Sequence, residues 1–247
     1  MNQSLKNKRA LVTGGSRGIG AAIVKRLASE GAHVALTYSS SPDRAKEVVK
    51  AAQALGVKSL AIQADSADAK AVVAAVECTV KELGGIDILV NNAGIAVIGP
   101  IDEFKLEDFD RTMAINVRAV FVATQAAIKH MKEGGRIINI GSTNAERVPF
   151  AGAAVYSASK AALQGLVKGL SRDLGPRGIT INNVQPGPVD TDLNPDEGEF
   201  ADMLKKLTAL PRYAKPDEIA GMVAYLASPE ASYITGASLM IDGGFSA

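Results

Sequence analysis

A tyrosine and a lysine four residues apart, Tyr156 and Lys160, form the pair of side chains in this sequence best suited to acid–base chemistry. The segment 157–174 is predicted to be helical, because leucines recur there at helical spacing. Residues four apart lie on one face of a helix, so the phenol and the ammonium are expected to point the same way. A nearby ammonium favours the phenolate and lowers the pKa of a tyrosine from its usual value of about 10. The same spacing also fits a surface tyrosine beside a solvated lysine, so the rest of the chain has to decide.

Strands and helices alternate along the chain, which is typical of a parallel sheet covered by helices on both faces. We therefore expect one α/β domain over residues 1–247, a Rossmann fold with a doubly wound parallel sheet of about seven strands, whose ligands bind at the carboxyl ends of the strands. The expected strands are 9–13, 32–38, 59–63, 86–91, 136–141, 179–184 and 238–241, and the expected helices include 67–83, 106–131, 157–174, 201–210 and 215–227.

A glycine cluster, Thr13-Gly14-Gly15-Ser16-Arg17-Gly18-Ile19-Gly20, follows the first expected strand. Glycines permit a tight turn and let a pyrophosphate approach the start of the next helix, although the spacing differs from the usual Gly-x-Gly-x-x-Gly. The second expected strand ends in Tyr38-Ser39-Ser40-Ser41, without the acid that binds the ribose of NAD(H). Hydroxyl groups and Arg17 suit a 2′-phosphate instead. The sequence therefore predicts NADP(H) as the cofactor.

The charge and composition of the chain exclude several classes of function. The net charge of +1, without a basic run, gives no reason to expect nucleic acid as a partner. The polar start of the chain and the lack of a long apolar run argue against a signal peptide and a membrane span. A single cysteine, Cys78, excludes an internal disulfide and fits a reducing cytoplasm. With only two histidines, a histidine-rich metal site is not expected. We expect a cytoplasmic protein that binds a small molecule.

In this order, Thr13-Gly14-x-x-x-Gly18-x-Gly20, Asn91-Asn92-Ala93-Gly94 and Tyr156-x-x-x-Lys160 resemble the short-chain dehydrogenase/reductases, and the likeness runs nearly end to end. The resemblance implies that Ser142 holds the substrate oxygen and that Tyr156 donates a proton. It implies that Lys160 lowers the pKa of Tyr156 and binds the nicotinamide ribose, while Asn116 holds a water that leads to solvent. It further implies a homotetramer, and cofactor contacts at Gly14, Ser16, Arg17, Gly18, Ile19, Gly20, Tyr38, Ser39, Ser40, Asp65, Ser66, Asn92, Ala93, Gly94, Tyr156, Lys160, Pro186, Gly187, Val189 and Thr191.

The same resemblance implies an NADPH-dependent reduction of a ketone or aldehyde to an alcohol, beneath a substrate lid at about 187–213. Acidic side chains dominate the start of this segment, and 201–210 reads as an amphipathic helix, so a largely apolar carbonyl substrate is expected. Two alternatives stay open. One is a 3-oxoacyl-carrier-protein reductase, which Arg177 fits at a docking position but Glu133 does not. The other is a regulatory member of the family that binds cyclic-di-GMP.

Overall fold

A seven-stranded sheet forms the centre of the molecule, and the computed structural model describes residues 3–247. The strands are β1 (Arg9–Val12), β2 (His33–Tyr38), β3 (Ser59–Gln63), β4 (Ile88–Asn91), β5 (Arg136–Ile140), β6 (Thr180–Pro186) and β7 (Ser238–Ile241). All neighbouring strands are parallel, in the order β3-β2-β1-β4-β5-β6-β7. The order changes direction between β1 and β4, and a doubly wound sheet binds its ligands beside such a point.

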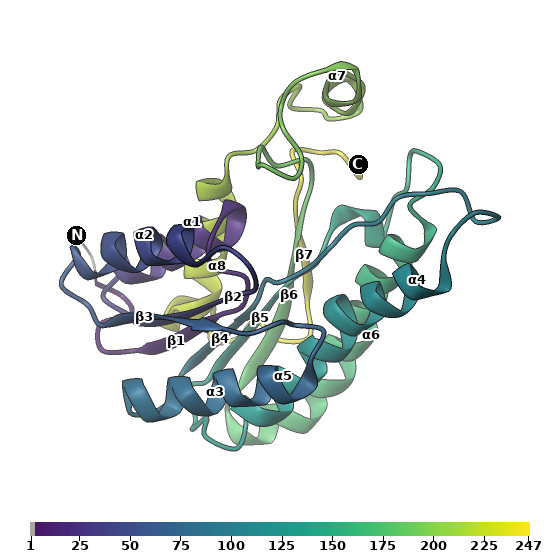
Figure 1. Cartoon of the computed structure of the whole chain (residues 1–247). Helices are drawn as coiled ribbons and strands as arrows, with labels where there is room; N and C mark the ends of the chain where they lie inside the picture. The colour runs from purple at the N-terminus through teal and green to yellow at the C-terminus, as the bar shows by residue number, and fades with distance from the viewer. Residues whose placement is uncertain (1–2) are drawn as a thin grey trace.

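Helices cover both faces of the sheet (Figure 1). They are α1 (Gly18–Ser29), α2 (Pro42–Gln53), α3 (Ala69–Leu83), α4 (Leu106–Met113), α5 (Ala119–Ala127), α6 (Ala154–Leu174), α7 (Glu199–Lys206) and α8 (Pro216–Ala227). α1, α2 and α8 lie on one face, and α3, α5 and α6 lie on the other. α7 stands apart, beyond the carboxyl ends of the strands and near the C-terminus. The prediction of a single doubly wound Rossmann domain is confirmed.

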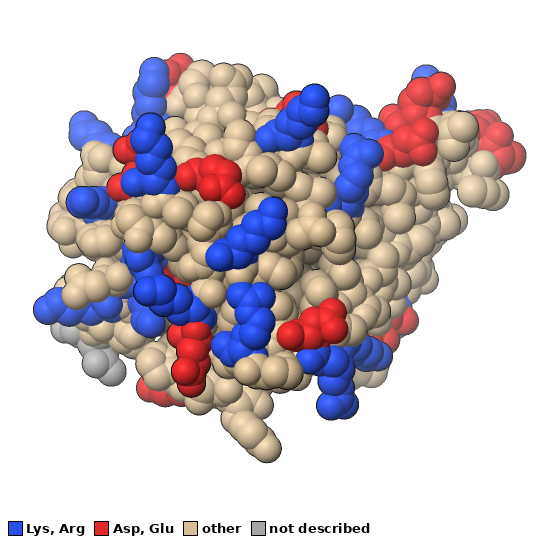
Figure 2. Space-filling model, turned by 90° about the horizontal axis from the view of Figure 1, so that it is seen from below, with Lys and Arg blue, Asp and Glu red and all other residues tan. Residues whose placement is uncertain are grey.

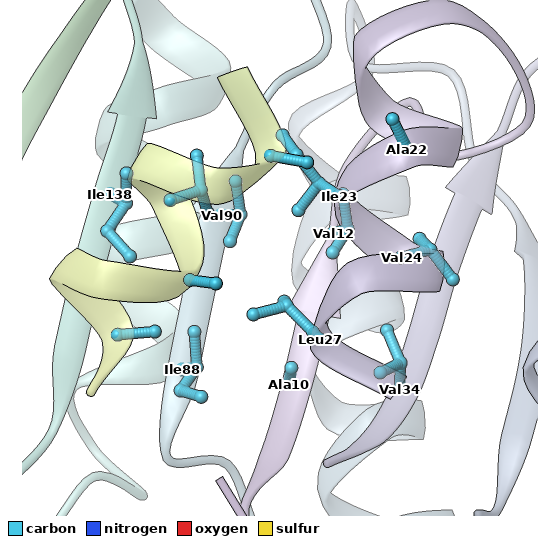
Figure 3. Close-up of a cluster of buried hydrophobic side chains, with 14 of the residues drawn as sticks. Ala10, Val12, Ala22, Ile23, Val24, Leu27, Val34, Ile88, Val90 and Ile138 are labelled. Atoms are coloured by element: carbon cyan, nitrogen blue, oxygen red, sulfur yellow. The ribbon is translucent and has the colours of Figure 1, made fainter. Parts of the chain in front are cut away.

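Two hydrophobic clusters hold the layers together. In the first, Val12 and Val90 of the sheet meet Ile23 and Leu27 of α1, and none of the four is exposed to solvent (Figure 3). The step from Ile23 to Leu27 is one helical turn, so both side chains face the sheet. The second cluster joins the opposite face of the sheet to α3, α5 and α6. Because the sheet is covered on both faces, β1, β2, β3 and β4 each carry a run of three apolar residues, whereas β6 buries the polar residues Asn182, Asn183 and Gln185.

A row of three buried amides and one hydroxyl group crosses four neighbouring strands. Asn91 Nδ2 donates to Asn139 Oδ1 at 2.9 Å, and Asn139 Nδ2 donates to Asn183 Oδ1 at 3.0 Å. Asn183 Nδ2 then donates to Ser238 Oγ at 3.1 Å. These residues are register partners on β4, β5, β6 and β7, and the three asparagines are at most 3% exposed. A slip of one residue would leave the buried amides unpaired, so the row fixes the strand register.

The helix predicted over 106–131 is interrupted, and this prediction is wrong. Residues Ala114–Arg118 form a π-helical turn between α4 and α5. This turn carries Asn116, whose side chain bonds the main chain of Ile95 in the loop after β4. Single π-helical turns of this kind occur often at functional sites. α5 ends at Ala127, because two of the following N–H groups bond carbonyls only three residues back.

Three other helices have boundaries that differ from the predicted ones by two residues or more, and α8 begins at residue 216 rather than 215. α3 begins at residue 69 rather than 67, because the Asp68 carboxylate caps the helix by accepting from the N–H of Lys70. α6 begins at residue 154 rather than 157, since the buried side chain of Val155 extends its apolar face. α7 spans 199–206 rather than 201–210, because the N–H groups of Leu207 and Thr208 bond carbonyls three residues back and end the helix.

Charges of both signs are spread over the face seen in Figure 2, where Asp and Glu lie among Lys and Arg rather than apart from them. Within residues 3–247, none of the helices combines the length and the apolarity that crossing a bilayer requires. The homotetramer implied by the resemblance stays a prediction.

Candidate active site

The glycine turn between β1 and α1 is tied to the ends of the two neighbouring strands. The N–H of Gly14 donates to Thr37 Oγ1 at 3.0 Å, and Asn92 Nδ2 donates to the Gly14 carbonyl at 3.0 Å. A Cβ atom at Gly20 would lie 2.3 Å from that carbonyl oxygen and 2.5 Å from Asn92 Nδ2, so only glycine fits. Gly14 and Gly18 have φ values of 65° and 52°, in the left-handed region that favours glycine. The glycine spacing therefore follows from this turn, which leaves the start of α1 open to a phosphate.

One cavity of about 450 Å³ extends from this turn along the carboxyl ends of the strands. Ser142, Tyr156 and Lys160 line it, whereas Asn116 lies behind its wall. All the other residues predicted to contact a cofactor also line it: Gly14, Ser16, Arg17, Gly18, Ile19, Gly20, Tyr38, Ser39, Ser40, Asp65, Ser66, Asn92, Ala93, Gly94, Pro186, Gly187, Val189 and Thr191. The structure thus brings together residues from position 14 to position 194 of the chain.

Tyr156 and Lys160 stand one turn apart on α6 and face this cavity. Lys160 Nζ lies 5.8 Å from the centre of the Tyr156 ring and donates to the Ile140 carbonyl at 2.8 Å. Burial lowers the pKa of Lys160 to about 8, because an ammonium inside the protein loses its hydration. Burial also raises the pKa of Tyr156, and a hydrogen bond with Ser142 offsets only part of this rise. The net shift of the Tyr156 pKa is therefore upward, and the phenol keeps its proton at neutral pH. That Lys160 lowers this pKa stays a prediction.

Ser142 follows β5 and places a second hydroxyl group beside that of Tyr156. Its Oγ accepts from the N–H of Asn144 at 3.1 Å, which orients the side chain, and only 8% of the residue is exposed. The two hydroxyl groups are close enough to share a hydrogen bond. A site of this kind can direct two hydrogen-bond donors at one substrate oxygen.

Asn116 connects three segments around the site. Its Oδ1 accepts from the N–H of Ile95 at 2.9 Å, and its Nδ2 donates to the Ile95 carbonyl at 2.9 Å and to Ser159 Oγ at 3.0 Å. A Cβ atom at Gly94 would lie 3.4 Å from both Asn116 Oδ1 and Lys160 Nζ, so these two polar atoms flank Gly94. Asn116 therefore holds the loop after β4 against α6, and its role in holding a water stays a prediction.

Some residues of the cavity wall have no counterpart in the predicted set. Arg111 on α4 reaches the cavity, and its guanidinium lies 3.9 Å from the carboxylate of Asp65. Apart from Arg111, each of these additional wall residues lies within three residues of a predicted site residue, so closeness in sequence to a predicted residue could have identified them. The wall residues outside the predicted catalytic and cofactor-binding residues are Thr37, Ser41, Ala64, Ile95, Ala96, Arg111, Ile115, Ile140, Gly141, Asp192, Leu193 and Asn194, the last three of which lie in the predicted lid. Over residues 3–247, no three His, Cys, Asp or Glu side chains are placed to hold a metal ion.

Comparison with known proteins shows likeness along the whole chain. A family model described as enoyl-(acyl carrier protein) reductase matches residues 14–246. A short-chain dehydrogenase/reductase from Serratia marcescens is 67% identical, with a TM-score of 0.97 and coverage of 98% of this chain and 99% of that one. A short-chain dehydrogenase from Burkholderia cenocepacia, crystallised in complex with NADP, is 56% identical with the same TM-score and coverage. The cyclic-di-GMP-binding biofilm dispersal mediator protein of Escherichia coli is 53% identical over 97% of this chain and 98% of its own length.

Proposed function

Since the chain belongs to the short-chain dehydrogenase/reductase family, we propose that it is an oxidoreductase that uses NADPH to reduce a ketone or aldehyde to an alcohol. The observation that carries this proposal is the meeting of Ser142, Tyr156 and Lys160 in the same cavity as the glycine turn. The turn offers a phosphate-binding helix start, and the three side chains offer hydrogen-bond donors and a proton to a carbonyl group.

The residues of the site fit the needs of carbonyl reduction. Bound NADPH supplies the hydride. As the carbonyl carbon accepts it, negative charge develops on the oxygen, and the hydroxyl groups of Ser142 and Tyr156 stabilise that charge. Tyr156 then gives its proton to the oxygen, and its raised pKa keeps this proton available at neutral pH. The ammonium of Lys160 stabilises the phenolate that is left.

Several features of the cavity favour NADP(H) over NAD(H). Arg17, at the start of α1, is exposed and lines the cavity together with Ser39 and Ser40. The nearest acid after β2, Asp43, lies in the first turn of α2 and not in the cavity wall. A guanidinium with hydroxyl groups suits a 2′-phosphate, whereas a carboxylate would repel it. The complex of the Burkholderia relative with NADP supports this choice.

The substrate is inferred to be largely apolar. Ile98 and Phe200 are about half exposed and Leu193 is 70% exposed. They belong to the loop after β4 and to the proposed lid 187–213, two segments beside the site, and Leu193 lines the cavity. The Phe200 ring meets that of Phe150 edge to face, with 5.4 Å between the ring centres. Lys205 is the first basic residue of the lid and follows its acidic ones, so the lid does not attract an anionic acyl group.

Cyclic-di-GMP binding is the second candidate function, because the relative from Escherichia coli carries that ligand in its name. A cavity built for one dinucleotide has room for another. A protein that only binds a ligand, however, has no chemical need for Ser142, Tyr156 and Lys160 together. Reduction of acyl groups on a carrier protein is less favoured. Carrier proteins are acidic, and one of the two family docking positions holds Glu133 here.

The direct test is to compare the binding of NADPH, NADH and cyclic-di-GMP to the purified protein, followed by NADPH oxidation with a panel of ketones and aldehydes. We expect NADPH to bind more tightly than NADH and to be consumed with apolar carbonyl compounds. Tight binding of cyclic-di-GMP, with no turnover of any carbonyl compound, would favour the regulatory role instead.

The pKa of Lys160 predicts how reduction depends on pH. Below about pH 8 the ammonium is charged and supports the phenolate, and above it this support is lost. We expect kcat/KM for reduction to be level at neutral pH and to fall by about tenfold per unit once the pH exceeds the pKa of Lys160. The measurement is a pH profile of kcat/KM, with Lys160→Arg as the comparison because arginine stays charged throughout. A break near pH 8 that persists in Lys160→Arg would contradict the assignment.

A further inference from the structure

An ion pair joins α2 to the segment that follows β6. The guanidinium of Arg44, in the first turn of α2, pairs with the carboxylate of Asp192. Asp192 lies in the wall of the cavity next to Thr191. Arg44 follows the serines at positions 39–41, which line the same cavity. The pair therefore connects the side of the cavity that is proposed to bind the adenosine ribose with the start of the proposed lid.

Two guanidinium groups act on this one carboxylate. The pKa of Asp192 is lowered first by the hydrogen bond and charge of Arg44, and to a smaller extent by the charge of Arg17. The neighbouring charges on α2, Asp43 and Lys46, pair with each other. Two arginines with adjacent serine hydroxyl groups form the chemical surroundings of a phosphate group. A carboxylate at this place has the charge and the acceptors to stand in for one.

The pair is also easy to exchange. The side chains of Arg44 and Asp192 are 54% and 53% exposed. Water therefore screens their attraction, and ion pairs of this kind add little to stability. A phosphate monoester carries more charge than a carboxylate and has three acceptor oxygens, so it competes well for the same guanidinium.

We propose that Arg44 is a second residue that recognises the 2′-phosphate of the cofactor, and that Asp192 is the anion held by Arg44 when this phosphate is absent. The inference rests on the proposed function, because it requires NADPH in the cavity. Binding of the phosphate takes Arg44 from Asp192 and frees the segment 190–194 from α2. NADH, which lacks the phosphate, leaves the pair intact. Arg44 thus determines cofactor specificity and links it to the position of the proposed lid.

The first experiment measures the dissociation constants of NADPH and NADH by calorimetry, without turnover. Arg44→Ala is expected to weaken NADPH by about tenfold and to change NADH by less than about twofold. Lys46→Ala is the matched control, since it removes another exposed cation of α2, which pairs with Asp43 on its own helix rather than with Asp192 in the cavity wall. It is expected to change neither constant. An NADPH-to-NADH ratio that is the same in Arg44→Ala as in the native protein overturns the inference and leaves the proposed function standing.

The second experiment tests the exchange itself. Asp192→Asn is expected to tighten NADPH by about threefold to tenfold, and to have a much smaller effect when Arg44→Ala is already present. Equal tightening in both backgrounds would show that Asp192 only repels the phosphate directly, and would overturn the exchange. A native protein that does not prefer NADPH over NADH would contradict the cofactor assignment, and the inference with it. Thermal unfolding of each variant confirms that these exposed changes leave the fold intact.

Discussion

Replacing Tyr156 by phenylalanine is expected to remove reductase activity while the cofactor still binds. The ring stays in place and only the hydroxyl group is lost, so the substrate oxygen loses one hydrogen-bond donor and its source of a proton. A positioned general acid contributes about 10²- to 10⁴-fold to the rate, and we expect kcat to fall by that range. The measurement is the loss of NADPH absorbance with a saturating carbonyl substrate, together with the dissociation constant of NADPH.

Two further variants make this test specific. Ser142→Ala removes the other hydroxyl group beside the substrate oxygen and is expected to lower kcat by about 10²-fold, as loss of one oxyanion donor usually does. Tyr225→Phe makes the same chemical change on α8, at a half-exposed tyrosine outside the cavity wall, and is expected to leave kcat unchanged. Full activity in a folded Tyr156→Phe protein would rule out Tyr156 as the proton donor and require another source of the proton.

The arrangement of the helices and strands was predictable, because the residues that each of them buries recur at a regular spacing in the sequence. Val12 and Val90 lie in strands that are buried on both faces, and such strands appear in the sequence as short apolar runs. Ile23 and Leu27 mark the buried face of α1 by their spacing. The π-helical turn at Ala114–Arg118 leaves no such mark, because apolar residues continue through it. What marks the turn is the hydrogen bond between Asn116 and the loop after β4, and the spacing of apolar residues cannot show such a bond.

In the active site, too, some features were predictable from the sequence and others were not. The positions around the glycine turn were predictable. A Cβ atom at Gly20 would lie 2.3 Å from a backbone oxygen, so glycine is required there. The pairing of Arg44 with Asp192 was not, since 148 residues separate them and only the fold brings them together. The direction of the pKa shift of Tyr156 was missed for a related reason. Spacing shows that a lysine is near, but not that burial raises the pKa of Tyr156.

The row of amides across the sheet leads to the second large effect, this time on stability. Asn139→Ala would leave the buried Oδ1 of Asn183 without its partner, and the buried Nδ2 of Asn91 with only a long hydrogen bond of 3.4 Å to Thr124 Oγ1. Each unpaired buried group costs about 1–3 kcal/mol, so the free energy of unfolding is expected to fall by about 2–5 kcal/mol. This is a large part of the 5–15 kcal/mol or so typical of a folded domain. Urea denaturation and thermal unfolding measure it, and Tm is expected to fall by about 10 °C.

A variant at the end of the row shows whether the loss of stability comes from the row itself or from shortening any side chain. Ser238→Ala removes only the last acceptor, on the edge strand β7, and is expected to cost no more than about 1–2 kcal/mol. If Asn139→Ala costs no more than Ser238→Ala, the row does not act as a unit. The row also ends close to the active site, because Asn91 precedes Asn92 and Asn139 lies three residues before Ser142. Loosening the register of β4 and β5 therefore moves the hydroxyl of Ser142 relative to Tyr156 on α6, and kcat is expected to fall even well below the Tm of the variant.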